Sequence, residues 1–131
     1  MSPVAGAYIF MRILIVDDSE LIRRGLADIL SSETEWQVCG EAKDGLEGIQ
    51  KALELLPDLV LLDVSMPGLG GLETASRLRQ ELPSIDIIFL SQHDPVHLLP
   101  RALELGARAC VDKSRLTKDL IATIKRVAAG R

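Results

Sequence analysis

The chain has 131 residues, of which 47% are hydrophobic and 26% are charged, with a formal net charge of -4. This length predicts one domain that buries about two thirds of its unfolded surface, and the negative charge gives no support to nucleic-acid binding by this chain. No apolar run reaches the roughly 18 residues of a membrane span, no signal peptide is expected, and the two cysteines, Cys39 and Cys110, fit a reducing cytoplasm better than a disulfide scaffold.

Five short apolar runs alternate with longer amphipathic segments along the chain. The runs are rich in Val, Ile and Leu and almost unbroken, which is typical of strands that are buried on both faces. They predict strands at residues 13–16, 36–40, 59–62, 85–90 and 107–111.

The segments between these strands have the spacing of amphipathic helices. In the first, an apolar stripe is expected to face the core, and the neighbouring Arg23 and Arg24 are expected on a solvated face. The second is predicted over about 44–56, the third over about 71–82, the fourth from near Pro95, and the fifth over about 116–128. The inward residues are predicted to be Leu21, Ile22, Leu26, Ile29 and Leu30 in the first helix, and Leu46, Ile49, Leu53 and Leu56 in the second.

Residues that start and stop helices agree with these boundaries. Ser19 is a candidate N-cap, and Asp94 with Pro95 forms a second candidate start. Gly106 is a candidate C-cap glycine, and the second and third helices are followed by Pro57 and Pro83. Strands that alternate with helices predict an α/β fold, a doubly wound parallel sheet whose carboxyl ends share one ligand-binding edge.

Acidic side chains gather at this predicted edge. Asp17 and Asp18 follow the first strand, Asp63 ends the third, Ser91 ends the fourth, and Lys113 lies just past the fifth. Three carboxylates in one pocket are costly without a compensating charge. Because Mg2+ prefers oxygen ligands, the sequence predicts a magnesium site, with one member of the aspartate pair bound directly and the other through water.

The same residues suit phosphoryl transfer, which depends on positioning and on neutralising charge around the phosphoryl oxygens. Asp63 is the natural carboxylate nucleophile. Lys113 is a point charge suited to a phosphate, and Ser91 offers a hydroxyl donor.

Four motifs carry a resemblance to a known family: "ILIVDDS", "PDLVLLDVSMPGLGG", "IIFLSQHD" and "GARACVDKS". In order, spacing and strand context they resemble the receiver domains of two-component response regulators, over about residues 11–130. The resemblance implies a CheY-like, flavodoxin-like (βα)5 domain with strand order 2-1-3-4-5. In that order Cys39 and Cys110 lie on opposite edge strands, about 19 Å apart, so a disulfide between them is excluded.

The resemblance also implies a role for each site residue. Asp63 would accept a phosphoryl group from a histidine kinase. Mg2+ would be bound by the carboxylates of Asp18 and Asp63, by the backbone carbonyl of Ser65, and by Asp17 through water. Ser91 and Lys113 would contact the phosphoryl group and relay its presence.

Finer sequence features look most like the NarL/LuxR-type regulators, which carry a helix-turn-helix DNA-binding domain after the receiver. The expected function is therefore a cytoplasmic receiver, not a classical enzyme, that controls transcription through an output domain outside this chain. A homodimer is compatible with this interpretation. Residues 11–131 are assigned to the receiver, and residues 1–10 to an N-terminal extension or a remnant of cloning.

The sequence departs from the family pattern at two positions. Cys110 lies where many receivers have Tyr or Phe, so we expect the usual aromatic switch, which acts with Ser91, to be absent or displaced. Gly70 lies where an Asp is usual, which removes a charge or a helix cap.

Other functions for the same fold are less well supported. A receiver that works without phosphorylation, as an interaction module, is the main alternative. A phosphohydrolase would usually carry a second carboxylate two residues after the nucleophile, where this chain has Ser65. A flavin-binding protein would need aromatic residues that this acidic edge lacks.

Overall fold

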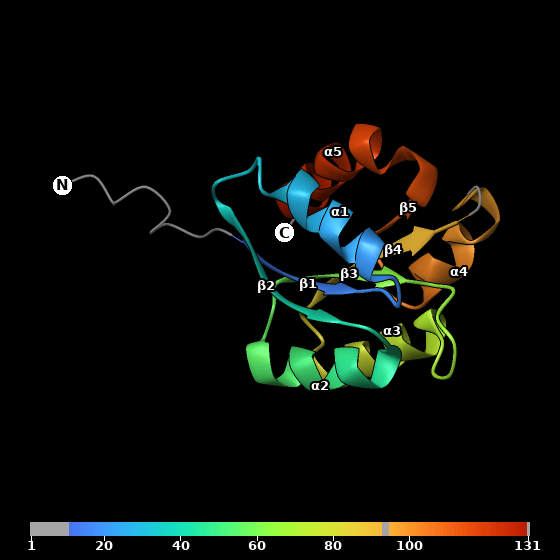
Figure 1. Ribbon diagram of the computed structural model, residues 1–131. Helices are drawn as coiled ribbons and strands as arrows, with labels where there is room; N and C mark the ends of the chain where they lie inside the picture. The colour runs from blue at the N-terminus through green and yellow to red at the C-terminus, as the bar shows by residue number, and fades with distance from the viewer. Residues whose placement is uncertain (1–10, 93–94, 131) are drawn as a thin grey trace.

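The computed structural model describes residues 11–92 and 95–130. One parallel sheet of five strands runs through the centre, in the order β2-β1-β3-β4-β5 (Figure 1). This is the order that the family resemblance implies. The strands are β1 (Met11–Val16), β2 (Trp36–Ala42), β3 (Leu59–Asp63), β4 (Asp86–Ser91) and β5 (Ala109–Asp112). All five lie within one or two residues of their predicted positions.

Helices cover both faces of the sheet, which explains why the central strands are apolar throughout. Two helices pack on one face, and three helices lie on the other (Figure 1). The first face carries α1 (Glu20–Leu30) and α5 (Leu116–Ala129), and the second carries α2 (Gly45–Leu55), α3 (Gly71–Glu81) and α4 (Leu99–Glu104). None of the described helices is long and apolar enough to cross a membrane.

The predicted inward face of α2 is wrong at three of its four residues, whereas the fourth, Ile49, is partly buried and packs against the core as predicted. Leu46, Leu53 and Leu56 are 63%, 45% and 61% exposed, and the buried residues of this helix are Gly45, Gly48 and Ala52. A Cβ atom added at Gly48 would lie only 3.0 Å from a Val16 methyl carbon. The helix backbone thus approaches β1 closely, and only small side chains fit between them.

The predicted stripe of α1 is correct at Leu26 and Leu30, which are fully buried, and wrong at Leu21, which is 79% exposed. Ser19 is the N-cap as predicted, because its hydroxyl accepts a hydrogen bond from the Ile22 N–H (3.2 Å). The cap residue lies two residues after Asp17, and the helix begins at the next residue, Glu20.

The fourth helical segment is divided into a short 3-10 turn at Pro95–His97 and the six-residue α4. Gly106 ends α4 as predicted, with a positive φ of 89°. The N–H of Ala107 donates to Ala102 O and that of Gly106 to Leu103 O, the pattern of a Schellman motif. The proposed helix start at Asp94 and the assignment of residues 1–10 lie outside the described residues.

Candidate functional site

Three aspartates meet at the carboxyl edge of the sheet. Asp17 and Asp18 follow β1 and Asp63 ends β3, and one oxygen from each lies within 4.8 Å of the others. Asp17 and Asp63 are buried, whereas Asp18 is exposed. The predicted acidic cluster is therefore present, and it is open to solvent on the side of Asp18.

Lys113 supplies the positive charge of this cluster. Its Nζ lies 2.8 Å from Asp17 Oδ2 and 3.2 Å from Asp63 Oδ1, and its side chain is only 9% exposed. Burial alone would lower the pKa of this ammonium, but the two carboxylates outweigh burial and raise it. Lys113 thus stays charged, and it is not the solvated surface lysine that its neighbour Asp112 could suggest.

Asp63 lies at the junction of β3 and the loop that precedes α3. Its Oδ1 accepts a hydrogen bond from the Ser65 N–H (2.9 Å) in addition to the Lys113 contact. Burial and the nearby Asp17 charge raise the pKa of Asp63, although Ser65 and Lys113 act in the opposite direction. The carboxylate is thus less stable as an anion here than in water, as is common at functional sites.

Close backbone packing fixes the loop after Asp63. A Cβ atom added at Gly71, the first residue of α3, would lie 2.4 Å from Asp63 O and 2.5 Å from Val64 Cα. Glycine is therefore needed at this position so that α3 can begin directly against the end of β3. The helix starts without a side-chain cap, because its N-cap is Gly70.

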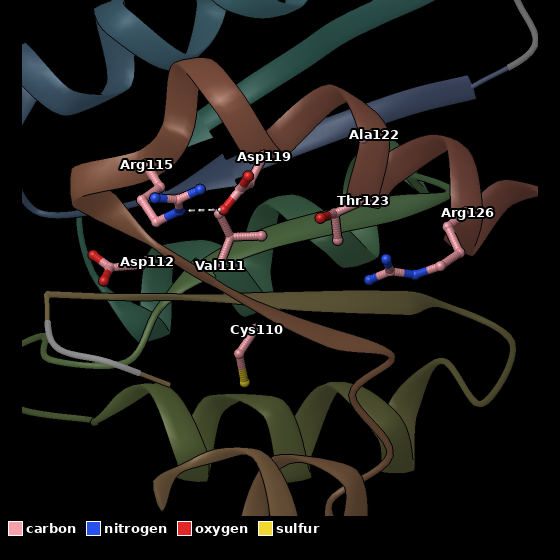
Figure 2. Close-up of a pocket in the computed structure, with 8 residues that line it drawn as sticks. All are labelled: Cys110, Val111, Asp112, Arg115, Asp119, Ala122, Thr123 and Arg126. Carbon is pink, nitrogen blue, oxygen red and sulfur yellow. Dashed lines mark hydrogen bonds and ion pairs between the residues drawn. The ribbon is translucent and has the colours of Figure 1, made fainter. Parts of the chain in front are cut away.

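Ser91 and Cys110 lie on the next two strands of the sheet, β4 and β5. Ser91 is buried at the end of β4, one residue after Leu90, which pairs with Asp63. Cys110 lies on β5 and lines a groove of about 510 Å³ between this strand and α5. Its sulfur points to the opposite side of the sheet from the α5 residues (Figure 2), in the layer that contains α3 and α4.

The two cysteines are separated as expected. Cys39 lies on the edge strand β2 and Cys110 on the opposite edge strand β5, and both are free thiols. Burial raises the pKa of Cys110 to about 11. This thiol is therefore neutral at physiological pH and poorly reactive.

Arg23 is a residue of the site that the sequence pattern missed. Its Nη1 donates to the backbone carbonyl of Asp17 (2.7 Å), and its Nε donates to Glu41 Oε1 (2.9 Å). The side chain is only 17% exposed, so the expected solvated position is wrong for Arg23, although it is correct for Arg24, which is 74% exposed. Helical spacing alone does not indicate this contact, because it depends on the neighbouring strand.

The donor set of the cluster suits a hard divalent cation. All three side chains offer carboxylate oxygens, the ligand type that Mg2+ prefers. Among residues 11–92 and 95–130, no donor forms a conventional hydrogen bond with the buried Asp17 Oδ2, whose charge faces the Lys113 ammonium. Asp18 is exposed, so a partly hydrated ion can reach it. The residues present therefore fit Mg2+.

Comparison with known proteins gives the same classification. Residues 13–125 match the family model of the response regulator receiver domain. The chain is 40% identical over 120 residues to the transcriptional activator protein ExaE of Pseudomonas putida, an alignment that covers 92% of this chain and 56% of that protein. The chain thus spans about half the length of the curated relatives that it matches.

Two solved structures have the same fold. A two-component response regulator of the LuxR family from Aurantimonas sp. SI85-9A1 is 31% identical with a TM-score of 0.87, over 92% of this chain and 86% of that one. The CheX–CheY–BeF3–Mg2+ complex from Borrelia burgdorferi contains a chain that is 25% identical with a TM-score of 0.79, over 91% and 90% of the two chains. On these grounds, the chain belongs to the receiver domain family of two-component response regulators.

Proposed function

We propose that this receiver accepts a phosphoryl group on Asp63 from the phosphohistidine of a sensor kinase, with Mg2+ as cofactor. The observation that carries the proposal is a cluster of three carboxylates beside the Lys113 ammonium. One oxygen from each of Asp17, Asp18 and Asp63 lies within 4.8 Å of the other two. Transfer of a phosphoryl group onto an aspartate needs a positioned carboxylate nucleophile and positive charge near the phosphoryl oxygens, and this arrangement supplies both.

In the proposed reaction, a carboxylate oxygen of Asp63 attacks phosphorus while the bond from phosphorus to the histidine nitrogen breaks. The contacts of Asp63 with the Ser65 N–H and with Lys113 both fall on Oδ1, so Oδ2 is the expected attacking atom. Lys113 and the Ser91 hydroxyl would then stabilise the phosphoryl oxygens. Hydrolysis of the acyl phosphate by water would return Asp63 to its carboxylate, so the domain would catalyse at most its own phosphorylation and slow dephosphorylation.

Mg2+, when bound, would offset the negative charge of the carboxylates and of the incoming phosphoryl group. We assign the carboxylates of Asp18 and Asp63 and the backbone carbonyl of Ser65 as its ligands, with Asp17 bound through water. The CheX–CheY complex from Borrelia burgdorferi contains Mg2+ together with BeF3, which supports Mg2+ as the ion by similarity.

The proposed output is transcription, through a DNA-binding domain outside this chain. The similarity to ExaE and to a LuxR-family regulator supports this output. Phosphorylation would shift an equilibrium between two conformers, with Ser91 and Cys110 as the switch residues and without the usual aromatic ring. A homodimer is a further expected partner state, and the two free thiols favour a reducing cytoplasm.

Incubation with Mg2+ and acetyl phosphate, followed by intact-mass measurement, tests this proposal. We expect one added phosphoryl group that depends on Mg2+ and is absent from Asp63→Asn. Parallel incubation with a phosphorylated kinase domain, sampled within seconds, covers a short-lived adduct. If no adduct forms with either donor, the phosphorylation-independent interaction module becomes the better function.

A further inference from the structure

The turn that carries Asp17 and Asp18 is held from several sides. Asp17 N–H donates to Ala42 O of β2 (3.0 Å), and Asp17 Oδ1 accepts from Ser19 N–H (2.9 Å). The carbonyl oxygen of Asp17 accepts from Arg23 Nη1 (2.7 Å). This last contact acts on the peptide group that joins Asp17 to Asp18, so it sets the direction in which Asp18 leaves the turn.

Asp18 depends on this backbone contact more than its neighbours do. Asp17 and Asp63 are buried, and both contact Lys113. Asp18 is exposed, and within the described part of the chain no ion pair or side-chain hydrogen bond holds its carboxylate. The orientation of the peptide group before it is therefore the main restraint on where the Asp18 carboxylate points.

Arg23 is itself fixed in place. Its Nε donates to Glu41 Oε1 (2.9 Å) on β2, so the guanidinium bridges a strand end and the aspartate turn. A planar guanidinium presents donors in a rigid fork and can satisfy both acceptors at once, whereas a lysine ammonium is a single point charge. The side chain is also largely buried, at 17% exposure, so water competes poorly for these contacts.

We infer that Arg23 is a positioning residue for the magnesium site, because it fixes the peptide group that aims Asp18 at the ion. This inference rests on the proposed function and extends it to a residue outside the set that contacts the ion or the phosphoryl group. The guanidinium itself repels a cation, so simple electrostatics predicts that its removal tightens Mg2+ binding. Positioning predicts the opposite sign.

Arg23→Met distinguishes electrostatic repulsion of the ion from positioning of the peptide group. It keeps most of the side-chain volume and removes both the positive charge and the hydrogen-bond donors of the guanidinium. We expect Mg2+ binding, measured by titration calorimetry on unphosphorylated protein, to weaken about tenfold, as is typical when a residue that orients a metal ligand is lost. Arg24→Met, the same change at the exposed neighbour, should bind Mg2+ as the unaltered chain does.

Two further measurements separate positioning from a general loss of structure. All titrations are made at a temperature where circular dichroism shows each variant to be folded. In metal-free protein, the NMR amide signals of Asp18 and Ser19 should move in Arg23→Met and stay in place in Arg24→Met. If Arg23→Met does not fold, the same titration is made with Arg23→Lys. This variant keeps the positive charge but lacks the planar guanidinium that reaches both acceptors, so it should also bind Mg2+ more weakly than the unaltered chain.

Unchanged or tighter Mg2+ binding by Arg23→Met, or by Arg23→Lys where Arg23→Met does not fold, would overturn the role of Arg23 and leave the proposed function intact. A failure of the unaltered chain to bind Mg2+ would instead contradict the proposed function, and the role of Arg23 with it. Weaker binding together with the amide shifts would support both.

Discussion

Asp63 is kept in an environment that disfavours its own charge. Burial and Asp17 raise its pKa above the ordinary value of 3.8, so the folded chain holds this proton to a higher pH than the unfolded chain does. Stability therefore falls as the pH rises through the interval between the two pKa values, and the loss persists at neutral pH. An ionised Asp63 is suited to chemistry at a cost in stability.

Asp63→Asn should therefore stabilise the metal-free protein. At pH 7 we expect the free energy of unfolding in urea to rise by about 1 kcal/mol, and the gain should shrink as the pH is lowered toward 3.8. Asp28→Asn, at an exposed position of α1, is the control and should change stability by less than about 0.5 kcal/mol. Destabilisation by Asp63→Asn at pH 7 would show that the Lys113 contact outweighs the burial of the charge.

Cys110 is expected to react slowly with thiol reagents, because the side chain is partly buried. With a pKa of about 11, only about one thiol in a thousand is ionised at pH 8. In a Cys39→Ser background, alkylation by iodoacetamide followed by mass spectrometry should accelerate about tenfold per pH unit between pH 8 and 10. A rate that levels off below pH 9 would contradict the burial of this thiol.

At the scale of elements, the site depends on how closely α3 approaches β3. Gly71→Ala places a methyl group against the backbone of Asp63 and Val64, and backbone cannot give way as a flexible side chain can. We expect a loss of about 2 kcal/mol in the free energy of unfolding, measured in urea, together with weaker Mg2+ binding because the Asp63 loop moves.

A second glycine provides the matched control for this change. Gly25 is exposed in the middle of α1, and a Cβ added there would meet no atom of the described residues within 4 Å beyond its neighbours and the backbone of its own helix. Gly25→Ala should therefore stabilise the protein by about 0.5 to 1 kcal/mol through helix propensity. If both substitutions changed stability in the same direction, the close approach of α3 would not be the cause of the effect at Gly71.

The sequence predicts strands and their ends better than helix faces. Unbroken apolar runs identify buried strands, and the residue after each run lies at one edge by topology, so Asp17, Asp63 and Lys113 could be placed together in advance. The buried face of α2 could not be predicted in this way, because large apolar side chains normally face the core. Here Gly48 and Ala52 lie inward instead, which allows the helix to pack closely on the sheet. Arg23 was missed for a related reason: its partners lie on other segments.

At the scale of the whole molecule, the apolar clusters on the two faces stabilise the sheet, whereas repulsion between carboxylates destabilises its carboxyl edge. The two core clusters on the faces of the sheet are contributed by all five strands and the helices that cover them. At the edge, three carboxylates lie close together, and two of them contact the single ammonium of Lys113. Since a bound cation would balance this excess of negative charge, the edge is the part of the fold whose stability a ligand can change most.

Mg2+ should therefore stabilise the entire domain by linkage. At a concentration 100 times its Kd, an ion that binds only the folded chain adds about 2.7 kcal/mol to the free energy of unfolding, which calorimetry or fluorescence-detected melting would record as a higher Tm. Asp18→Asn keeps the buried Asp17–Lys113–Asp63 contacts and removes the exposed ligand, so it should melt normally without Mg2+ and lose most of the Mg2+-dependent gain. An equal gain in this variant would exclude Asp18 as a ligand and place the ion, if it binds, among other carboxylates of the chain.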